Sequence, residues 1–387
     1  MAVDLSLVSV PVVVITNAFV LAYTILYISY LLPRRERDPP EDCWTPLVSA
    51  IVPACNEEAV VGQIIRDLDA QSYGNMEIVV VAHNCRDRTY EVATSVPTRH
   101  PLRVIRLETK ESGKALALGE GLRHAKGEVI AVFDADNRVP PHFVERGLRY
   151  LREYDGVQGR ILSKNPKKNR LTYLQTAEFL LYSKAHQAGK FRAGYSCPLG
   201  GTGFMLRREA IDRAGGLRNL LVEDLDLSIR LALGGLRVAY GWDIETYDEK
   251  VSSWRAFLRQ RARWMAGYCQ MWRALPLGDA LRLVRYPFDL ICLLTPLVPV
   301  TILTGYLLTV SSLLGAKFLC TPAWWWVGSL ILMNSLATLT LREEEMGWAE
   351  RVLLPWAVMV YSLHMVPALF YAARVRSWGV SKTPHGG

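Results

Sequence analysis

Two stretches decide the fold: LVSAIVPA at residues 47–54 and EIVVVA at residues 77–82. Both are short and rich in β-branched residues, which is typical of strands buried in a sheet. Between them, residues 59–71 repeat apolar side chains at three- to four-residue spacing, as a helix packed on a sheet does. This order of strand, helix and strand predicts a βαβ unit and a mainly parallel α/β sheet.

The same alternation continues along the chain. Residues 102–107 are expected to form a strand, 115–125 a helix and 128–133 another buried strand. The polar sequences PACNEE, HNCRD and DADN directly follow three of the expected strands. Because ligands of open α/β sheets bind at the carboxyl ends of the strands, these sequences mark the predicted site.

Both ends of the chain are apolar, and half of the 387 residues are hydrophobic, with a mean hydropathy of +0.12. Residues 7–32 carry no charge and would extend about 39 Å as a helix, enough to cross a bilayer. A cleaved signal peptide is the alternative, but this run is too long and lacks a basic region before it. Further apolar runs occupy residues 286–314, 323–341 and 352–373.

These runs define the expected domains. Residues 1–32 would form a transmembrane helix, 33–285 one α/β domain, 286–373 about three more transmembrane helices, and 374–387 a tail. Core helices of a large soluble protein are the alternative explanation of the C-terminal runs. Within the α/β domain, residues 252–275 alternate aromatic and basic side chains and are expected to lie in the membrane interface.

Basic residues set the expected orientation. Arg34, Arg35 and Arg37 follow the first apolar run, which places the α/β domain in the cytosol. We therefore expect an integral membrane protein, and assign it to the plasma membrane. Three later spans would put the basic tail outside, and Pro296 and Pro299 suggest a re-entrant segment that resolves this conflict.

Charge and cysteine content exclude several classes of protein. The net charge is +8, but the basic residues are dispersed and several flank apolar runs. Bilayer headgroups and a phosphorylated ligand explain them better than nucleic acid does. The seven cysteines are scattered without a C-x-x-C pair, which favours a reduced cytosolic domain over a disulfide scaffold or a zinc site. A homo-oligomer is compatible with this composition.

Three groups of residues are candidates for chemistry. Asp134 and Asp136 end an expected strand, where two carboxylates one residue apart can hold a divalent cation, although acidic pairs are also common in turns. Glu223 and Asp224 precede an amphipathic helix and suit either catalysis or a helix cap. The sequence QRARW at residues 260–264 offers an arginine for phosphate and a flat indole, and equally suits an amphipathic surface helix.

Taken together and in this order, the motifs resemble those of the family 2 glycosyltransferases. The resemblance is to the membrane-integrated group that includes cellulose, hyaluronan and chitin-oligosaccharide synthases and ceramide glucosyltransferase, and it covers residues 47–275. VPACNEE is similar to the opening motif of the family, SGKALALGEGL to its lysine motif, DAD to its metal motif, VED to its catalytic-base motif and QRARW to its Q-x-x-R-W signature. The resemblance implies a GT-A fold, which is a Rossmann-like α/β fold.

The resemblance also implies a role for each motif. Asp224 would be the general base of an inverting transfer, and Asp134 and Asp136 would hold Mg²⁺ or Mn²⁺. The residues implied in acceptor binding are Glu223, Gln260 and Trp264. The residues implied in donor binding are Pro53, Ala54, Asn56, Glu57, Asp87, Lys114, Asp134 and Arg263.

Two positions depart from the family pattern. AHNCRD has His83 where an acidic residue is common, and PACNEE has Cys55 where an aromatic residue is common. The nucleobase pocket is therefore the least determined part of the expected site. Asp87 is expected to contact the base, whereas His83 suits either a hydrogen bond to the base or ribose or simple packing.

The expected function is transfer of a sugar from a nucleotide-sugar, with a UDP-sugar as the expected donor, to a growing β-linked glycan, in single or successive steps. The alternative within the family is a single transfer to a lipid acceptor. A transporter or receptor with an inserted soluble domain would not need the paired carboxylates, and it would tolerate Asp224→Asn without loss of function.

Overall fold

The structure is a computed structural model of the chain. It describes residues 6–33, 44–294, 297, 303, 304, 307, 310 and 323–375. Several expectations therefore fall outside the described residues: the basic residues Arg34, Arg35 and Arg37, the prolines at 296 and 299, most of the apolar run 286–314, and nearly all of the tail.

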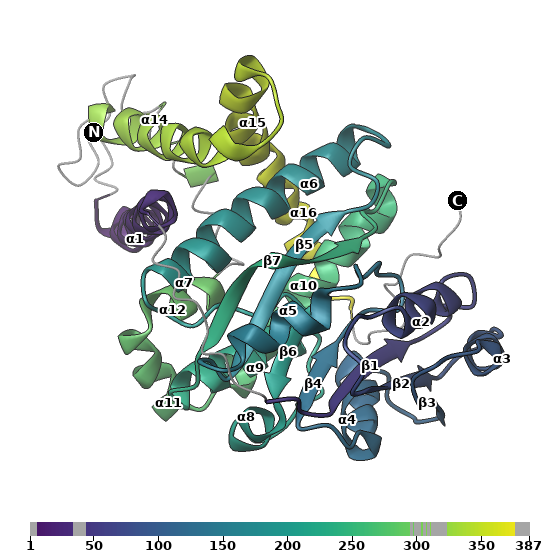
Figure 1. Ribbon diagram of the computed structural model, residues 1–387. Helices are drawn as coiled ribbons and strands as arrows, with labels where there is room; N and C mark the ends of the chain where they lie inside the picture. Colours follow the sequence, from purple (N-terminus) through teal and green to yellow (C-terminus); the bar gives the residue numbers. More distant parts are fainter. Residues whose placement is uncertain are drawn as a thin grey trace.

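The strands are β1 (Val48–Ala54), β2 (Met76–His83), β3 (Leu102–Leu107), β4 (Val129–Val132), β5 (Gly156–Ser163), β6 (Phe204–Arg207) and β7 (Val238–Asp248). They form one mixed sheet of seven strands in the order β3-β2-β1-β4-β6-β5-β7 (Figure 1). The strands β3, β2, β1 and β4 run parallel, as the alternation predicted. In contrast, β6 is antiparallel to both β4 and β5, because the chain returns through a glycine-rich turn at residues 200–203.

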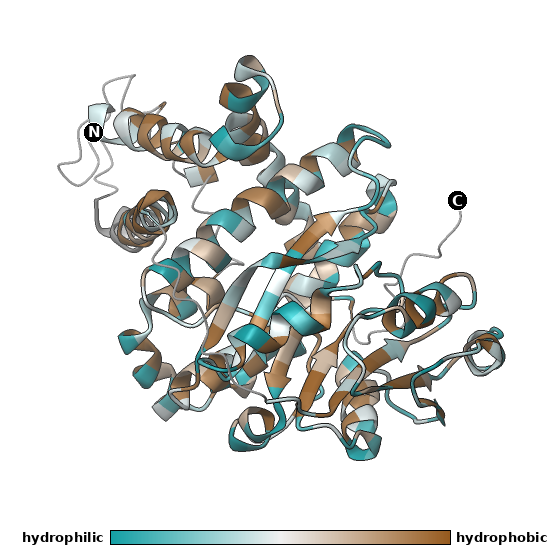
Figure 2. Cartoon of the chain, viewed as in Figure 1, coloured by the Kyte–Doolittle hydropathy of each residue, from teal (hydrophilic) through white to brown (hydrophobic). Residues whose placement is uncertain are grey.

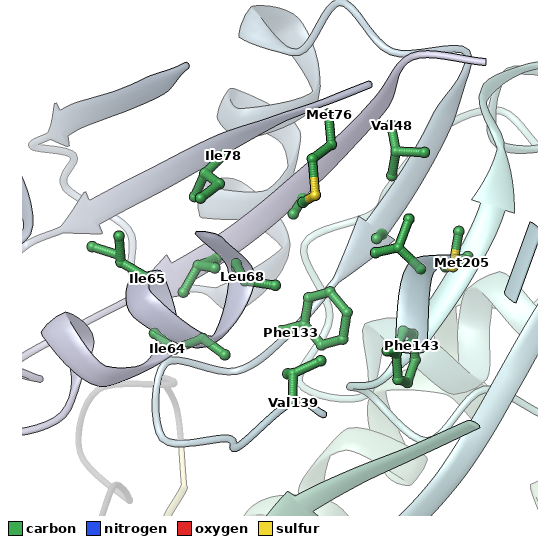
Figure 3. Packing of buried hydrophobic residues seen from close by; sticks show 14 of the residues in the cluster. Val48, Ile64, Ile65, Leu68, Met76, Ile78, Phe133, Val139, Phe143 and Met205 are labelled. Carbon is green, nitrogen blue, oxygen red and sulfur yellow. The ribbon is translucent and has the colours of Figure 1, made fainter. Parts of the chain in front are cut away.

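Helices cover both faces of this sheet. Those of the α/β domain are α2 (Val61–Asp69), α3 (Thr89–Ser95), α4 (Lys114–His124), α5 (Phe143–Tyr150), α6 (Arg170–Tyr182), α7 (Lys190–Arg192), α8 (Arg208–Arg213), α9 (Glu223–Leu233), α10 (Trp254–Ala274) and α11 (Leu277–Arg282). α2 and α5 pack on one face, where Leu68, Phe133 and Phe143 belong to one buried cluster (Figure 3). α4 and α9 pack on the other, where Leu118 and Leu227 are buried. The carboxyl ends of the strands are thus left open between the layers.

Of the apolar helices, all but the last gather at the side of the molecule away from β3, and the last packs against α10 nearer its centre (Figure 1). They are α1 (Ser6–Leu31), α12 (Pro287–Leu293), α14 (Ala323–Thr340), α15 (Trp348–Tyr361) and α16 (Met365–Ala372). Within the described residues, three helical segments are long and apolar enough to cross a membrane: Val13–Leu31, Trp324–Glu343 and Trp348–Ala372. Figure 2 shows brown, hydrophobic residues along α1 and α14. Of the expected span at residues 286–314, the described part is mainly α12.

A π-helical turn, η1 (Ser183–Gly189), joins the α/β domain to these helices. A side chain added at Gly189 would lie 2.2 Å from the carbonyl oxygen of Leu26, so glycine is required for η1 to approach α1 this closely. Directly after η1, the Lys190 ammonium lies 2.5 Å from a carboxylate oxygen of Asp289 on α12. Both side chains are buried, and the ion pair therefore ties the domain to the start of the membrane region.

α10 corresponds to the expected interfacial segment at residues 252–275. It buries Phe257, Met265 and Met271 inside the protein and leaves Trp254 and Trp272 exposed. Its apolar face is therefore largely occupied by protein contacts, and contact with the membrane interface stays a prediction that rests on the exposed indoles.

Candidate active site

The loops after β1 and β2 are held by two asparagines in the left-handed backbone region. Asn56 has a φ of 58° and Asn84 a φ of 51°, a conformation that asparagine tolerates better than most residues. The Asn56 side-chain oxygen accepts a hydrogen bond from the Arg86 amide at 2.8 Å. The two loops are thereby fixed to each other beside Pro53 and Ala54, which pair with β2.

Asp87 links the same two loops. Its carboxylate accepts hydrogen bonds from the backbone amides of Glu58 and Thr89, each at 3.1 Å, and from the Thr89 hydroxyl. Burial acts to raise the pKa of Asp87, but these hydrogen bonds outweigh it and lower the pKa. Glu57 is buried beside it and donates its backbone amide to Thr89. The Asp87 carboxylate therefore organises the loops, and contact with a nucleobase stays a prediction.

His83 and Cys55, the two departures from the family pattern, are both buried. His83 Nε2 lies 2.8 Å from the hydroxyl oxygen of Thr109. Burial lowers the pKa of His83, which favours the neutral ring. These observations favour the packing role over contact with a ligand.

Asp134 and Asp136 follow β4 and line a large cavity of ≈ 1030 Å³. The turn that carries them is fixed because the Asp134 amide donates to Thr202 Oγ1 at 2.9 Å and to Asn137 Oδ1 at 3.1 Å. Ala135 is buried between the two carboxylates. Both acidic residues are partly exposed, and so remain accessible to a ligand in the cavity.

Lys114 connects the acidic groups of this cavity. It begins α4, and its ammonium lies 2.6 Å from Asp134 Oδ1 and 3.6 Å from Glu223 Oε1. It also donates to the carbonyl oxygen of Gly201 at 2.7 Å. Burial acts to lower the pKa of Lys114, but the nearby carboxylates outweigh it and raise the pKa, so the side chain stays charged.

Glu223 and Asp224 form the first turn of α9, and both line the cavity. Burial raises the pKa of Glu223 to about 7 and also raises the pKa of Asp224, whereas the Lys114 charge lowers both. Asp224 Oδ1 accepts the backbone amide of Leu225 at 2.8 Å. A carboxylate held in this way, with a raised pKa, suits a general base.

Gly201, which the sequence reasoning did not single out as a site residue, lies against both charged groups. It has a φ of +79°, and a Cβ added to it would be 3.1 Å from Asp224 Oδ2 and 3.7 Å from Lys114 Nζ. Only glycine combines this backbone conformation with such a close approach. The run GGTG at residues 200–203 was the signal in the sequence that could have marked this loop.

α10 contributes Gln260, Arg263 and Trp264 to the lining of the cavity. Arg263 is held by a hydrogen bond of 3.3 Å to the carbonyl oxygen of Leu221. Burial lowers the pKa of Arg263, and the carboxylates of Glu223, Asp224 and Asp134 oppose that shift. The Trp264 ring is held by the Arg261 guanidinium, whose carbon lies 4.3 Å from the ring centroid.

The structure therefore brings together most of the expected site around one cavity. The expected residues that line it are Lys114, Asp134, Asp136, Glu223, Asp224, Gln260, Arg263 and Trp264. The expected residues that lie in or after β1 and β2, outside the lining of this cavity, are Pro53, Ala54, Asn56, Glu57 and Asp87. Tyr182 and Tyr268 also line the cavity, and the sequence reasoning had not selected them.

The Asp134 and Asp136 carboxylates fit a divalent cation. Among the described residues, no group of three or more His, Cys, Asp or Glu side chains forms a protein-only metal site. Mg²⁺ commonly takes one or two carboxylates and completes its shell with substrate phosphates and water. Two partly exposed carboxylates at the edge of a cavity match that requirement, and the cation would neutralise a diphosphate there.

The fold and this site define a glycosyltransferase of the GT-A type. The chain belongs to the family described as Glycosyltransferase like family 2, whose family model matches residues 46–267, more than half of the chain. The mannosyltransferase PcManGT from Pyrobaculum calidifontis, solved in complex with GDP-Man and Mn²⁺, is similar with a TM-score of 0.63 at 19% identity. That match covers 95% of this chain and 99% of PcManGT, and at this identity it supports the GT-A fold alone.

Relatives with closer sequences carry different activities in their names. The chain is 32% identical over 265 residues to the beta-monoglucosyldiacylglycerol synthase of Synechocystis sp., which covers 65% of this chain and 55% of that protein. It is 29% identical over 231 residues to the probable glycosyltransferase YdaM of Bacillus subtilis, and this match covers 57% of this chain and 55% of YdaM. It is 31% identical over 169 residues to the probable glucomannan 4-beta-mannosyltransferase 3 of Arabidopsis thaliana, and this match covers 42% of this chain and 30% of that protein. The chain thus spans about half the length of the two bacterial relatives.

Proposed function

We propose that this chain is an inverting glycosyltransferase that moves a sugar from a nucleotide-sugar to an acceptor hydroxyl at a membrane. The observation that carries the proposal is the convergence of Asp134, Asp224 and Arg263 on one cavity. These residues come from the turn after β4, from α9 and from α10, which are far apart in the sequence. A carboxylate pair for a cation, a partly buried base and a cation for phosphate are the groups that sugar transfer from a diphosphate needs.

In the proposed reaction, Asp224 accepts the proton of the acceptor hydroxyl. The hydroxyl oxygen then bonds to the anomeric carbon as the bond from that carbon to the diphosphate oxygen breaks on the opposite face, which inverts the configuration. Arg263 stabilises the negative charge of the departing nucleoside diphosphate. Asp134 and Asp136 would hold Mg²⁺ or Mn²⁺, which supplies further positive charge to the diphosphate when bound.

The loops after β1 and β2 are assigned to the nucleotide. Parallel strands of such sheets present their ligands at the carboxyl ends, where Asn56 and Asp87 hold the loops in place. The nucleobase would lie there, with the diphosphate directed toward Lys114 and Asp134. Gln260 and Trp264 would contact the acceptor, and the indole would stack on a sugar ring.

Two acceptors are candidates. The resemblance to a glucomannan mannosyltransferase favours a growing β-linked glycan, and the resemblance to a monoglucosyldiacylglycerol synthase favours a lipid. The apolar helices support a position in the membrane. The α/β domain is assigned to the cytosolic side, which supplies nucleotide-sugars, because Arg34, Arg35 and Arg37 follow the first apolar run.

The test is transfer by the purified chain in detergent. A panel of radiolabelled nucleotide-sugars is incubated with glycan and lipid acceptors, and the product is sized. Release of nucleoside diphosphate that depends on an acceptor, and is lost in Asp224→Asn, supports the proposal. Absence of transfer from every donor, with the protein folded and able to bind nucleoside diphosphate, refutes it.

A further inference from the structure

The catalytic cavity does not end at the α/β domain. Its lining continues from Asp224 to residues of the apolar helices: Phe19 and Val20 on α1, Leu330 and Met333 on α14, and Val358 and Met359 on α15. We call this part the membrane arm, defined by its lining residues within 16–27, 326–337 and 355–362. The arm extends about 16 Å along α1, at about 1.5 Å per residue.

We infer that the membrane arm binds an acyl or alkyl chain of a lipid acceptor whose hydroxyl lies at Asp224. This inference rests on the proposed function and names the acceptor class of the same site. An arm that runs among apolar helices, and opens into the site of transfer, would let a lipid keep its chain in apolar surroundings while its headgroup reaches the domain.

The chemistry of the wall favours a hydrocarbon over a glycan. A sugar that enters the arm must give up hydrogen bonds to water, and apolar side chains such as Phe19, Leu330 and Val358 replace none of them. The Asn334 amide, one of the polar groups in the arm, already donates to the carbonyl oxygen of Leu330 at 2.8 Å. The flexible side chains of Met333 and Met359 adapt readily to a chain of variable shape.

Neighbouring residues on the same helices provide matched controls. Val20 lines the arm, whereas the next residue, Leu21, is 62% exposed on the outside of α1. Leu330 lines the arm, whereas Ile331 is 53% exposed on the outside of α14. Val20→Trp and Leu330→Trp would fill the arm, while Leu21→Trp and Ile331→Trp add the same indole where lipid or solvent can accommodate it.

The first experiment measures transfer to 1-O-alkylglycerols of increasing chain length, which keep one headgroup. In the parent, kcat/KM should rise about fourfold per added CH₂ until the arm is filled. Val20→Trp and Leu330→Trp should raise KM for the long-chain acceptors by about tenfold or more and flatten this dependence. The Leu21→Trp and Ile331→Trp variants should follow the parent. Because all variants are compared in the same micelles, partition of the acceptors into detergent affects each of them equally.

The second experiment does not need turnover. A long-chain alkylglycerol with a diazirine at the chain end is photolysed with the full-length protein, and the labelled residues are mapped. Label on arm residues that disappears in Val20→Trp and persists in Leu21→Trp supports the inference. Label confined to outward residues such as Leu21 and Ile331 overturns it. Arm labelling without transfer from any donor supports the arm and refutes the proposed function instead.

A glycan in the arm would give a third pattern. In that case Val20→Trp would shorten a polymeric product and leave transfer to alkylglycerols unchanged, which overturns the lipid inference. Unchanged donor affinity, measured by titration of the nucleoside diphosphate, shows that each variant has kept its fold.

Discussion

The Lys114 ammonium lies 2.6 Å from a carboxylate oxygen of Asp134 and thereby joins the start of α4 to the end of β4. The same nitrogen lies within 3.6 Å of Glu223. One buried cation thus pairs with a carboxylate of the expected metal turn and with Glu223, the neighbour of the expected base Asp224. The Lys114 charge also lowers the pKa values of Glu223 and Asp224, so the titration of these two carboxyl groups depends on Lys114.

The pH dependence of transfer should reveal this coupling. Burial raises the pKa of Glu223 to about 7 and also raises the pKa of Asp224. Because the general base, Asp224, must be ionised, kcat/KM should be constant at alkaline pH and should fall on the acid side at a pH above the usual range of a carboxyl group. Lys114→Met removes a charge that lowers both pKa values, so the acid limb should move to higher pH. An acid limb in the parent near the ordinary aspartate pKa of about 3.9, or an identical limb in the variant, would contradict this coupling.

Asp224→Asn should keep the affinity for nucleoside diphosphate and reduce transfer by at least about 10²-fold, because an amide cannot accept the proton. Donor affinity is measured by titration and transfer by nucleoside diphosphate release at saturating acceptor. Glu223→Gln should lose less than Asp224→Asn. If Asp224→Asn turns over within about tenfold of the parent, Asp224 is not the base. Asp226 is a poor substitute because its carboxylate is bound by Arg230 at 2.5 Å.

Removal of divalent metal should abolish transfer, since Asp134 and Asp136 would share the cation with the diphosphate. Mg²⁺ or Mn²⁺ added back should restore it. Asp136→Asn should raise the metal concentration for half-maximal rate by about tenfold or more, equivalent to about 1.4 kcal/mol of lost binding. Asp212→Asn, which removes the same charge from an exposed position on α8, serves as the control. Full activity of the parent in excess chelator would exclude the cation.

Gly201→Ala should reduce transfer by about tenfold or more, because the new methyl group would lie 3.1 Å from Asp224 Oδ2 and displace the base. Gly215→Ala is the matched control: Gly215 has a φ of +80°, but an added Cβ meets nothing within 4 Å. Both variants carry the backbone strain, so both should lose thermal stability by a similar amount. Only Gly201→Ala should also lose transfer activity at a temperature where both variants are folded. Equal activities would show that the glycine serves the backbone alone.

The sequence predicts the elements of the fold better than their assembly. β1 to β4, α2 and α4 follow from alternating apolar periods, and their observed bounds lie close to the expected ones, whereas α3, between β2 and β3, was not expected. The antiparallel β6 was not expected, because its direction is set by the turn at residues 200–203 and by its pairing with β4. Local periodicity contains no information about either.

The candidate site shows the same limit. Asp134 and Asp224 stand 90 positions apart, and their spacing says nothing about proximity, so their association came from the family resemblance. The contact of Gly201 with Asp224 and the continuation of the cavity between α1 and α14 depend on tertiary packing. Both were therefore beyond the reach of the sequence reasoning. Most of the expected span at 286–314 falls outside the described residues and stays a prediction.

The buried pair of Lys190 and Asp289 limits how the protein can be divided. Removing one partner of a buried ion pair leaves an uncompensated charge and destabilises a protein by about 3–5 kcal/mol. A chain reduced to residues 33–285 would leave Lys190 without Asp289 and would uncover the surface of η1 that α1 covers. The excised domain should therefore unfold or aggregate, so catalytic domain and helices constitute a single cooperative unit that biochemical studies must isolate whole.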